Sequence, residues 1–261
     1  MSTSFLQSAP WLDAVVEIET LWLAPERRDR PLIVFLHEGL GSVAQWRGFP
    51  ARLCAAAECR GLVFSRPGYG RSTPRTAPWP QDYLQQQARA LAGYFDALGL
   101  QQERLFLFGH SDGASLALLF AAYFPERVRS LVAMAPHLFV EAKTGEGLRV
   151  ARAAYEHGGL KARLARYHAD TDSAFYGWND TWQRPGFEAW NIEDDLRSLA
   201  CPVLALQGVD DEYASLEQIR AIQRIWPATR LCELADCGHA PQIDQPQRVI
   251  AETLALLRND H

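Results

Sequence analysis

The sequence has little that would place it on nucleic acid or in a membrane. Its 261 residues carry a net charge of −5, so the basic excess typical of nucleic-acid and anionic-membrane partners is missing. No apolar run is long enough to span a bilayer. Residues 1–10 lack the basic start and apolar centre of a secretory signal. We therefore expect a cytoplasmic protein without nucleic-acid or membrane partners, whereas nothing in the sequence indicates an oligomeric state.

Metal and cofactor motifs are also missing. The five cysteines are an odd number without zinc-like spacing, which favours reduced thiols. Cys237 lies two residues before a histidine and is open to a metal or nucleophilic role, but a small buried residue is the simpler interpretation. Neither a phosphate-binding Gly-Lys loop nor a dinucleotide fingerprint occurs. We expect no metal and no cofactor.

What the sequence does contain is an alternation of buried strands and amphipathic helices. Continuous apolar runs, typical of strands covered on both faces, are separated by segments with helical spacing such as 46–57, 82–98 and 246–258. This order predicts an α/β fold with a doubly wound, mainly parallel sheet. The apolar runs occur at 31–36, 61–65, 105–108, 128–135, 202–208 and 229–234.

One segment departs from this alternation. Between 137 and 199 the strand-like runs disappear, aromatic residues become dense, and 149–167 has helical spacing with a break at two glycines. We predict an α/β core formed by 1–136 and 200–261, and an inserted helical cap at 137–199. A cap of this composition favours a small apolar or aromatic substrate, although the same aromatics would also make an ordinary second core.

The stretch 105–119 organises the chain. An apolar strand ends in Gly109-His110-Ser111-Asp112-Gly113, and a helical apolar run follows at once. Glycines on either side of Ser111 allow a turn too tight for side chains. The following helix start offers free N–H groups to a developing anion. This pattern predicts a nucleophilic serine at a strand-to-helix turn.

A nucleophilic serine needs a base and an acid to orient that base. The carboxyl ends of parallel strands meet at one edge, so only loops at those ends qualify. The loop after 202–208 supplies Asp210 and Asp211, and the loop after the last strand supplies His239. His110 is adjacent to Ser111 in sequence and is a poor base, because neighbouring side chains diverge at a tight turn.

The transition state of such a reaction carries an oxyanion that needs two donors. We expect one to be the N–H of Asp112. The second is expected from the glycine-rich loop after Leu36, where Gly39 allows close approach of the backbone.

Together these segments resemble the α/β-hydrolase superfamily along nearly the whole chain. The resemblance rests on five short motifs and implies a Ser111, His239 and Asp211 triad, with Asp211 favoured over Asp210 by its spacing. It also implies an oxyanion hole at Gly39, rather than Leu40, and Asp112. The motifs are His37-Glu38-Gly39, Gly68-Tyr69-Gly70-Arg71-Ser72, Gly109-His110-Ser111-Asp112-Gly113, Gly208-Val209-Asp210-Asp211 and Gly238-His239.

The chain departs from the family pattern at Glu38, where the family usually has glycine, and this places a carboxylate near the site. Arg66 and Arg149 are candidates for holding a substrate carboxylate, with a surface role equally open for each. We expect substrate contacts from five residues: Glu38, Leu40, His168, Trp178 and Ala240.

Three functions fit these residues. The favoured one is serine hydrolysis of a small carboxylic ester, lactone or thioester. The same triad also serves the hydrolysis of carbon–carbon bonds in ring-cleavage products, or a related lyase or synthase step, in aromatic-catabolism members. The third is a ligand-binding protein on a hydrolase scaffold.

Overall fold

The protein, described here from a computed structural model covering residues 3–75 and 77–258, has one eight-stranded sheet. The strand order is β1-β2-β4-β3-β5-β6-β7-β8, with β1 and β2 antiparallel to their neighbours and all other pairs parallel. This confirms the predicted fold class. The strands are β1 (Phe5–Trp11), β2 (Ala14–Leu23), β3 (Leu32–Leu36), β4 (Arg60–Phe64), β5 (Leu105–His110), β6 (Val128–Met134), β7 (Val203–Gly208) and β8 (Arg230–Leu234).

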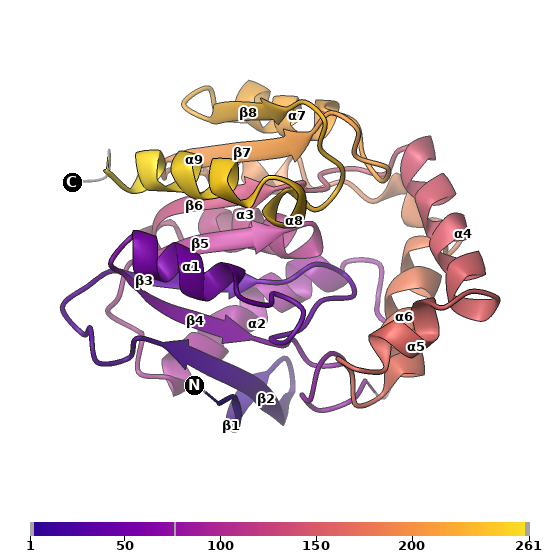
Figure 1. The fold of residues 1–261 in the computed structure, drawn as a ribbon, viewed down its shortest axis with the longest axis horizontal. Helices are drawn as coiled ribbons and strands as arrows, with labels where there is room; N and C mark the ends of the chain where they lie inside the picture. The colour runs from indigo at the N-terminus through magenta and orange to yellow at the C-terminus, as the bar shows by residue number, and fades with distance from the viewer. Residues whose placement is uncertain (1–2, 76, 259–261) are drawn as a thin grey trace.

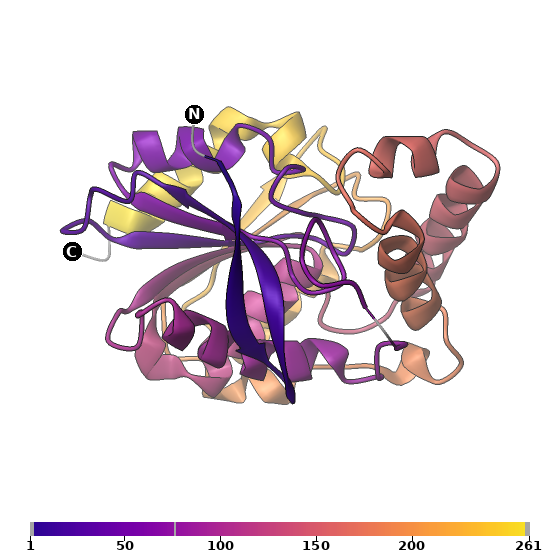
Figure 2. The same ribbon diagram turned by 90° about the horizontal axis from the view of Figure 1, so that it is seen from below.

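Helices cover both faces of the sheet, as Figures 1 and 2 show. Alternate residues of each buried strand point to opposite faces, so Phe35 and Phe108 pack in the core under α1 and α9, whereas Val34 and Leu107 pack under α2, α3 and α7. The continuous apolar runs of the sequence therefore reflect burial on both sides. The helices of this core are α1 (Phe49–Ala56), α2 (Tyr83–Ala97), α3 (Asp112–Tyr123), α7 (Glu217–Ile225), α8 (Pro241–Asp244) and α9 (Pro246–Arg258).

The chain between β6 and β7 forms a separate group of helices beyond the carboxyl edge of the sheet (Figure 1). They are α4 (Ala142–Glu156), α5 (Leu160–Leu164) and α6 (Thr171–Trp182). The first helix starts earlier than residue 149 because Glu141 and Thr144 form a reciprocal capping box. The expected break at 158–159 separates α4 from α5.

Two local features differ from expectation. The helix predicted from residue 46 begins at Phe49, because Arg47 adopts a left-handed conformation with φ 52° that a helix cannot continue through. The edge strand β1 lacks a clear apolar pattern, since Phe5 and Leu6 are exposed, yet it pairs along its length with β2. Among the described residues, no helix has both the length and the apolar character that crossing a bilayer requires.

Candidate active site

The turn between β5 and α3 is strained as its sequence predicted. Ser111 has φ 53° and ψ −120°, a conformation that costs a non-glycine residue free energy. A Cβ on Gly109 would lie under 3.0 Å from the backbone of Gly113, and a Cβ on Gly113 would overlap the carbonyl oxygen of Leu36. Both glycines are therefore required by close backbone packing, and they hold the serine above the sheet edge.

The sheet topology brings a second loop next to this turn. β3 lies between β4 and β5, and the chain leaves β3 for β4 on one side before it returns to β5 on the other. Such a reversal opens a crevice at the carboxyl ends of the two central strands. The loop that begins at His37 and the turn at Ser111 line this crevice together.

His239 meets Ser111 across 128 residues of sequence. Its Nε2 lies 2.9 Å from the Ser111 Oγ, and its Nδ1 lies 2.9 Å from both carboxylate oxygens of Asp211. An ionised carboxylate only accepts hydrogen bonds, so the ring nitrogen facing it donates. The other nitrogen is then free to accept the hydroxyl proton of Ser111.

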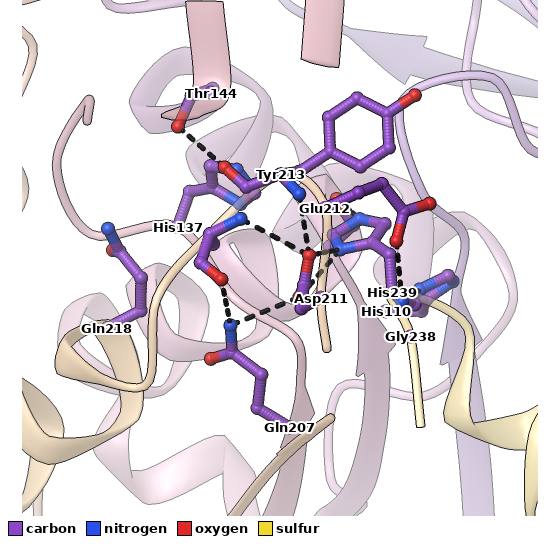
Figure 3. A network of polar contacts seen from close by, with 12 residues as sticks. His110, His137, Thr144, Gln207, Asp211, Glu212, Tyr213, Gln218, Gly238 and His239 are labelled. Carbon is purple, nitrogen blue, oxygen red and sulfur yellow. Dashed lines mark hydrogen bonds and ion pairs between the residues drawn. The ribbon is translucent and has the colours of Figure 1, made fainter. Parts of the chain in front are cut away.

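The carboxylate behind the histidine is completely buried, and Figure 3 shows the polar contacts around it. Asp211 accepts hydrogen bonds from the backbone N–H of Tyr213 and Ala214 and from the amide of Gln207. Burial alone would raise the pKa of Asp211, but the hydrogen bond and charge of His239 hold it below its usual value. Asp210, the alternative acid, is exposed. Within the described part of the chain, the hydrogen bonds of the His239 ring to a carboxylate go to Asp211 and not to Asp210.

The electrostatics of the site favour a protonatable histidine. Burial alone would lower the pKa of His239, but the Asp211 hydrogen bond and charge outweigh it, with smaller contributions from Glu212 and Glu38. Glu212 also accepts the backbone N–H of His239 at 3.1 Å. The pKa of this imidazole is therefore raised above its usual value.

The backbone N–H groups of Asp112 and Gly39, both near Ser111, have no acceptor among the described residues. Asp112 is the first residue of α3, and the first N–H groups of a helix have no intrahelical acceptor. Within residues 3–75 and 77–258, the N–H of Gly39 has no acceptor either. Gly39 and Asp112 both line the cavity that contains Ser111.

The cavity has a volume of about 220 Å³ and a mainly apolar wall to which α4, α5 and α6 contribute side chains. Three of the five expected contacts, Glu38, Leu40 and Trp178, line it. The complete lining is Glu38, Gly39, Leu40, Gln45, Ser111, Asp112, His137, Thr144, Leu148, Leu160, Leu164, Trp178, Trp182, Tyr213 and His239.

Two expected substrate contacts do not reach this cavity. Both ring nitrogens of His168 are bonded to main chain, since Nδ1 accepts from the N–H of Gly70 and Nε2 donates to the carbonyl of Leu40. His168 therefore ties two loops together and is absent from the lining, as is Ala240.

The two arginines proposed for a carboxylate also lie elsewhere. Arg66 is completely buried, with its guanidinium donating to protein oxygens. Arg149 lines a separate surface depression on α4. Sequence reasoning missed several wall residues, among them the titratable His137. His137 lies shortly after the end of β6, and this position at a strand end was the one sequence feature that could have predicted its place in the site.

Glu38, the residue that replaces the usual glycine, is held by a neighbouring imidazole. Its Oε2 lies 3.5 Å from the Nδ1 of His110. Burial alone would raise the pKa of Glu38, yet the His110 hydrogen bond and the charges of His110 and His37 lower it to about 2. His110 itself contacts the carbonyl oxygen of His239 through Nε2 at 2.7 Å. Glu38 therefore brings a carboxylate, paired with His110, to the cavity wall.

A metal site does not emerge from the described residues. Within residues 3–75 and 77–258, no group of three or more His, Cys, Asp or Glu side chains is placed to hold a metal ion. The five cysteines are buried and none of them forms a disulfide, and burial raises the pKa of the Cys237 thiol to about 12. Cys237 is thus an unreactive thiol beside the histidine loop.

Comparison with known proteins identifies the family. The model of the alpha/beta hydrolase family matches residues 33–252. A 2-hydroxy-6-oxononadienedioate/2-hydroxy-6-oxononatrienedioate hydrolase of Paraburkholderia phymatum is 33% identical over 83% of each chain. A 2-hydroxy-6-oxo-6-phenylhexa-2,4-dienoate hydrolase of Burkholderia cepacia is 25% identical over 87% of each chain.

Solved structures share the fold over nearly the whole chain. An esterase from Thermogutta terrifontis has a TM-score of 0.74 at 21% identity and covers 99% of both chains. An enol-lactonase from Burkholderia xenovorans has a TM-score of 0.76 at 17% identity, covering 93% of this chain and 97% of its own. The chain belongs to the alpha/beta hydrolase family and is an enzyme of the hydrolase class.

Proposed function

We propose that this enzyme hydrolyses a small, uncharged carboxylic ester, lactone or thioester through an acyl-enzyme on Ser111. His239 takes the proton of the Ser111 hydroxyl as the oxygen attacks the carbonyl carbon, and Asp211 holds the imidazole in the accepting tautomer. The observation that carries the proposal is the unbroken hydrogen-bonded chain from Oγ through the imidazole to the buried carboxylate. Water then releases the acyl group by the reverse path.

The same proposal assigns the free N–H groups of Gly39 and Asp112 to the oxyanion. They are backbone donors that need no reorganisation as charge develops, which is what stabilises a tetrahedral intermediate. Residues 137–199 act as a cap in this proposal, because side chains of α4, α5 and α6 form the apolar wall facing Ser111. The cap excludes water and sets the size of the substrate.

The charge of the cavity wall supports an uncharged substrate. The two curated relatives are named for substrates that are carboxylates, and a carboxylate favours a cationic partner in the site. Among the described residues lining this cavity, none is Lys or Arg, and Glu38 contributes a carboxylate of low pKa. A negatively charged group of a substrate placed beside Glu38 would meet another carboxylate there.

A second candidate is hydrolysis of a carbon–carbon bond on the same triad. Curated relatives with that activity support it, and His137 would supply a neutral imidazole to the cavity, since burial lowers the pKa of His137 to about 4. Turnover of a ring-cleavage diketone with negligible hydrolysis of esters would favour this candidate.

Labelling with a fluorophosphonate probe tests the shared mechanism. We expect the wild type to be labelled at Ser111, and Ser111→Ala to lose labelling and roughly 10³-fold or more of p-nitrophenyl acetate hydrolysis. A wild type that resists the probe and has no turnover would favour the binding-protein alternative. A screen of short esters, lactones, thioesters and ring-cleavage products separates the remaining candidates.

A further inference from the structure

The carbonyl oxygen of Glu38, beside the site, accepts three hydrogen bonds. It accepts from the Nδ1 of His37 at 2.7 Å, from the Nη2 of Arg66 at 3.0 Å and from the N–H of Gly41 at 3.0 Å. The Nε2 of His37 accepts the backbone N–H of Arg66, so its Nδ1 carries the proton. Three donors therefore converge on one oxygen.

That oxygen belongs to the same peptide unit as the N–H of Gly39. In a trans peptide the carbonyl and the N–H point in opposite directions, and none of the described peptide bonds is cis. Because the three donors fix the direction of the carbonyl oxygen, the N–H of Gly39 points away from Arg66. It therefore points towards the cavity that Gly39 lines. A cation at the carbonyl also polarises the amide and strengthens its N–H as a donor.

The same guanidinium reaches the residue that carries the second donor. The Nη2 of Arg66 lies 3.5 Å from the Oδ2 of Asp112, which also accepts from the hydroxyl of Tyr83 at 2.7 Å. The hydroxyl of Tyr83 in turn accepts from the indole N–H of Trp182 at 2.8 Å. Trp182 comes from the cap and lines the cavity, so the chain of bonds joins the cap to both proposed donors.

We propose that Arg66 is a positioning residue that sets both oxyanion donors, the N–H groups of Gly39 and Asp112, and links them to the cap through Tyr83 and Trp182. The inference rests on the proposed serine mechanism. Arg66 touches no substrate, because it is completely buried behind the loop. Its effect is on transition-state stabilisation and not on substrate binding, since the oxyanion develops only in the transition state.

Kinetics of Arg66→Met and Arg66→Lys test this role with p-nitrophenyl butyrate as the probe. We expect Arg66→Met to lower kcat by roughly ten- to a hundredfold, less than loss of a whole oxyanion donor, with KM unchanged within about twofold. Affinity for a boronic acid transition-state analogue is expected to fall in parallel with kcat/KM. Arg66→Lys keeps the charge and one donor, and is expected to recover part of kcat.

Arg60→Met is the matched control. Arg60 lies at the opposite end of β4, is also largely buried, and pairs with Glu103 far from the site. The inference is overturned if Arg60→Met and Arg66→Met lose kcat equally, or if Arg66→Met raises KM instead of lowering kcat. If Arg66→Met does not fold, the amide ¹⁵N–¹H shift of Gly39 in Arg66→Lys decides: an unchanged shift overturns the inference.

A failure of the proposed mechanism is distinguishable from a failure of this inference. The mechanism fails if Ser111→Ala retains wild-type turnover of the same ester. The inference fails if Ser111→Ala is inactive and the wild type is labelled at Ser111, yet substitution of Arg66 leaves kcat unchanged.

Discussion

Gly113 and Leu36 lie so close that a Cβ on the glycine would overlap the carbonyl oxygen of the leucine. The contact joins the start of α3 to the end of β3, and it fixes the height of Ser111 relative to the neighbouring loop. Backbone atoms cannot rotate away as a side chain does, so a methyl group at residue 113 would force the backbone to shift and would lower the free energy of unfolding.

Gly113→Ala is therefore expected to destabilise the protein by about 3 kcal/mol, at the upper end of the usual overpacking cost. Chemical denaturation measures the change. Gly145→Ala is the matched control, because Gly145 lies within α4 and its Cβ would meet only the Arg149 side chain at an ordinary distance. Helix propensity predicts that this control gains about 0.5–1 kcal/mol. Equal losses in both variants would contradict the packing argument.

Asp211→Asn and Asp210→Asn separate the two candidate acids. We expect Asp211→Asn to lower kcat/KM by roughly 10⁴-fold, because an amide no longer enforces the tautomer in which Nε2 of His239 accepts. Asp210→Asn is expected to stay near wild type, since that carboxylate is exposed. Rates with p-nitrophenyl acetate measure both, and a severe loss in Asp210→Asn alone would reverse the assignment.

Glu212→Gln should shift the pH dependence of kcat/KM. His239 acts as a base only when neutral, so activity rises with pH through its pKa. The charge of Glu212 is one of the causes that raise that pKa. Neutralising it is expected to move the acidic limb to lower pH, whereas Asp210→Asn leaves the limb in place. A shift to higher pH would contradict the sign of this argument.

Gly39 and Trp178 are predicted to be coupled. A Cβ on Gly39 would lie under 3.0 Å from the indole ring of Trp178, so Gly39→Ala is expected to lower kcat by displacing the loop or the ring. Trp178→Ala removes that obstacle and enlarges the cavity. In the double variant the loss at Gly39 is expected to shrink, with a coupling free energy of about 1 kcal/mol or more. Strict additivity would show that the two residues do not touch in solution.

Substrate charge gives a fifth prediction. We expect a neutral ester such as p-nitrophenyl butyrate to be preferred at least about tenfold in kcat/KM over the hemisuccinate, because Glu38 repels a second carboxylate in a poorly solvated cavity. Glu38→Gln should narrow the preference. A wild type that favours the anionic ester would point to a cation that reaches the site by another route.

Single residues of the sequence predict much of this architecture. The apolar runs around Val34 and Leu107 specify strands covered on both faces, and Gly109 and Gly113 specify the turn at Ser111, because local backbone geometry admits few other residues there. The sequence did not predict the edge strand β1. Its adjacent apolar residues Phe5 and Leu6 are both exposed and do not alternate with polar residues, and its position depends on pairing with β2. His168 was interpreted as a substrate contact, yet its ring bridges two loops that only the fold brings together.

The sequence by itself determined the order of the motifs along the chain and the strained turn at Ser111. It also identified a serine and a histidine at the ends of strands. Only the tertiary structure placed Asp211, which its spacing had favoured, in contact with the imidazole. It also decided that His168 lies outside the cavity and that Arg66 lies behind the peptide unit of Gly39. The reason is physical: backbone strain and apolar periodicity are local properties. A contact across 128 residues depends on how the whole sheet twists and packs.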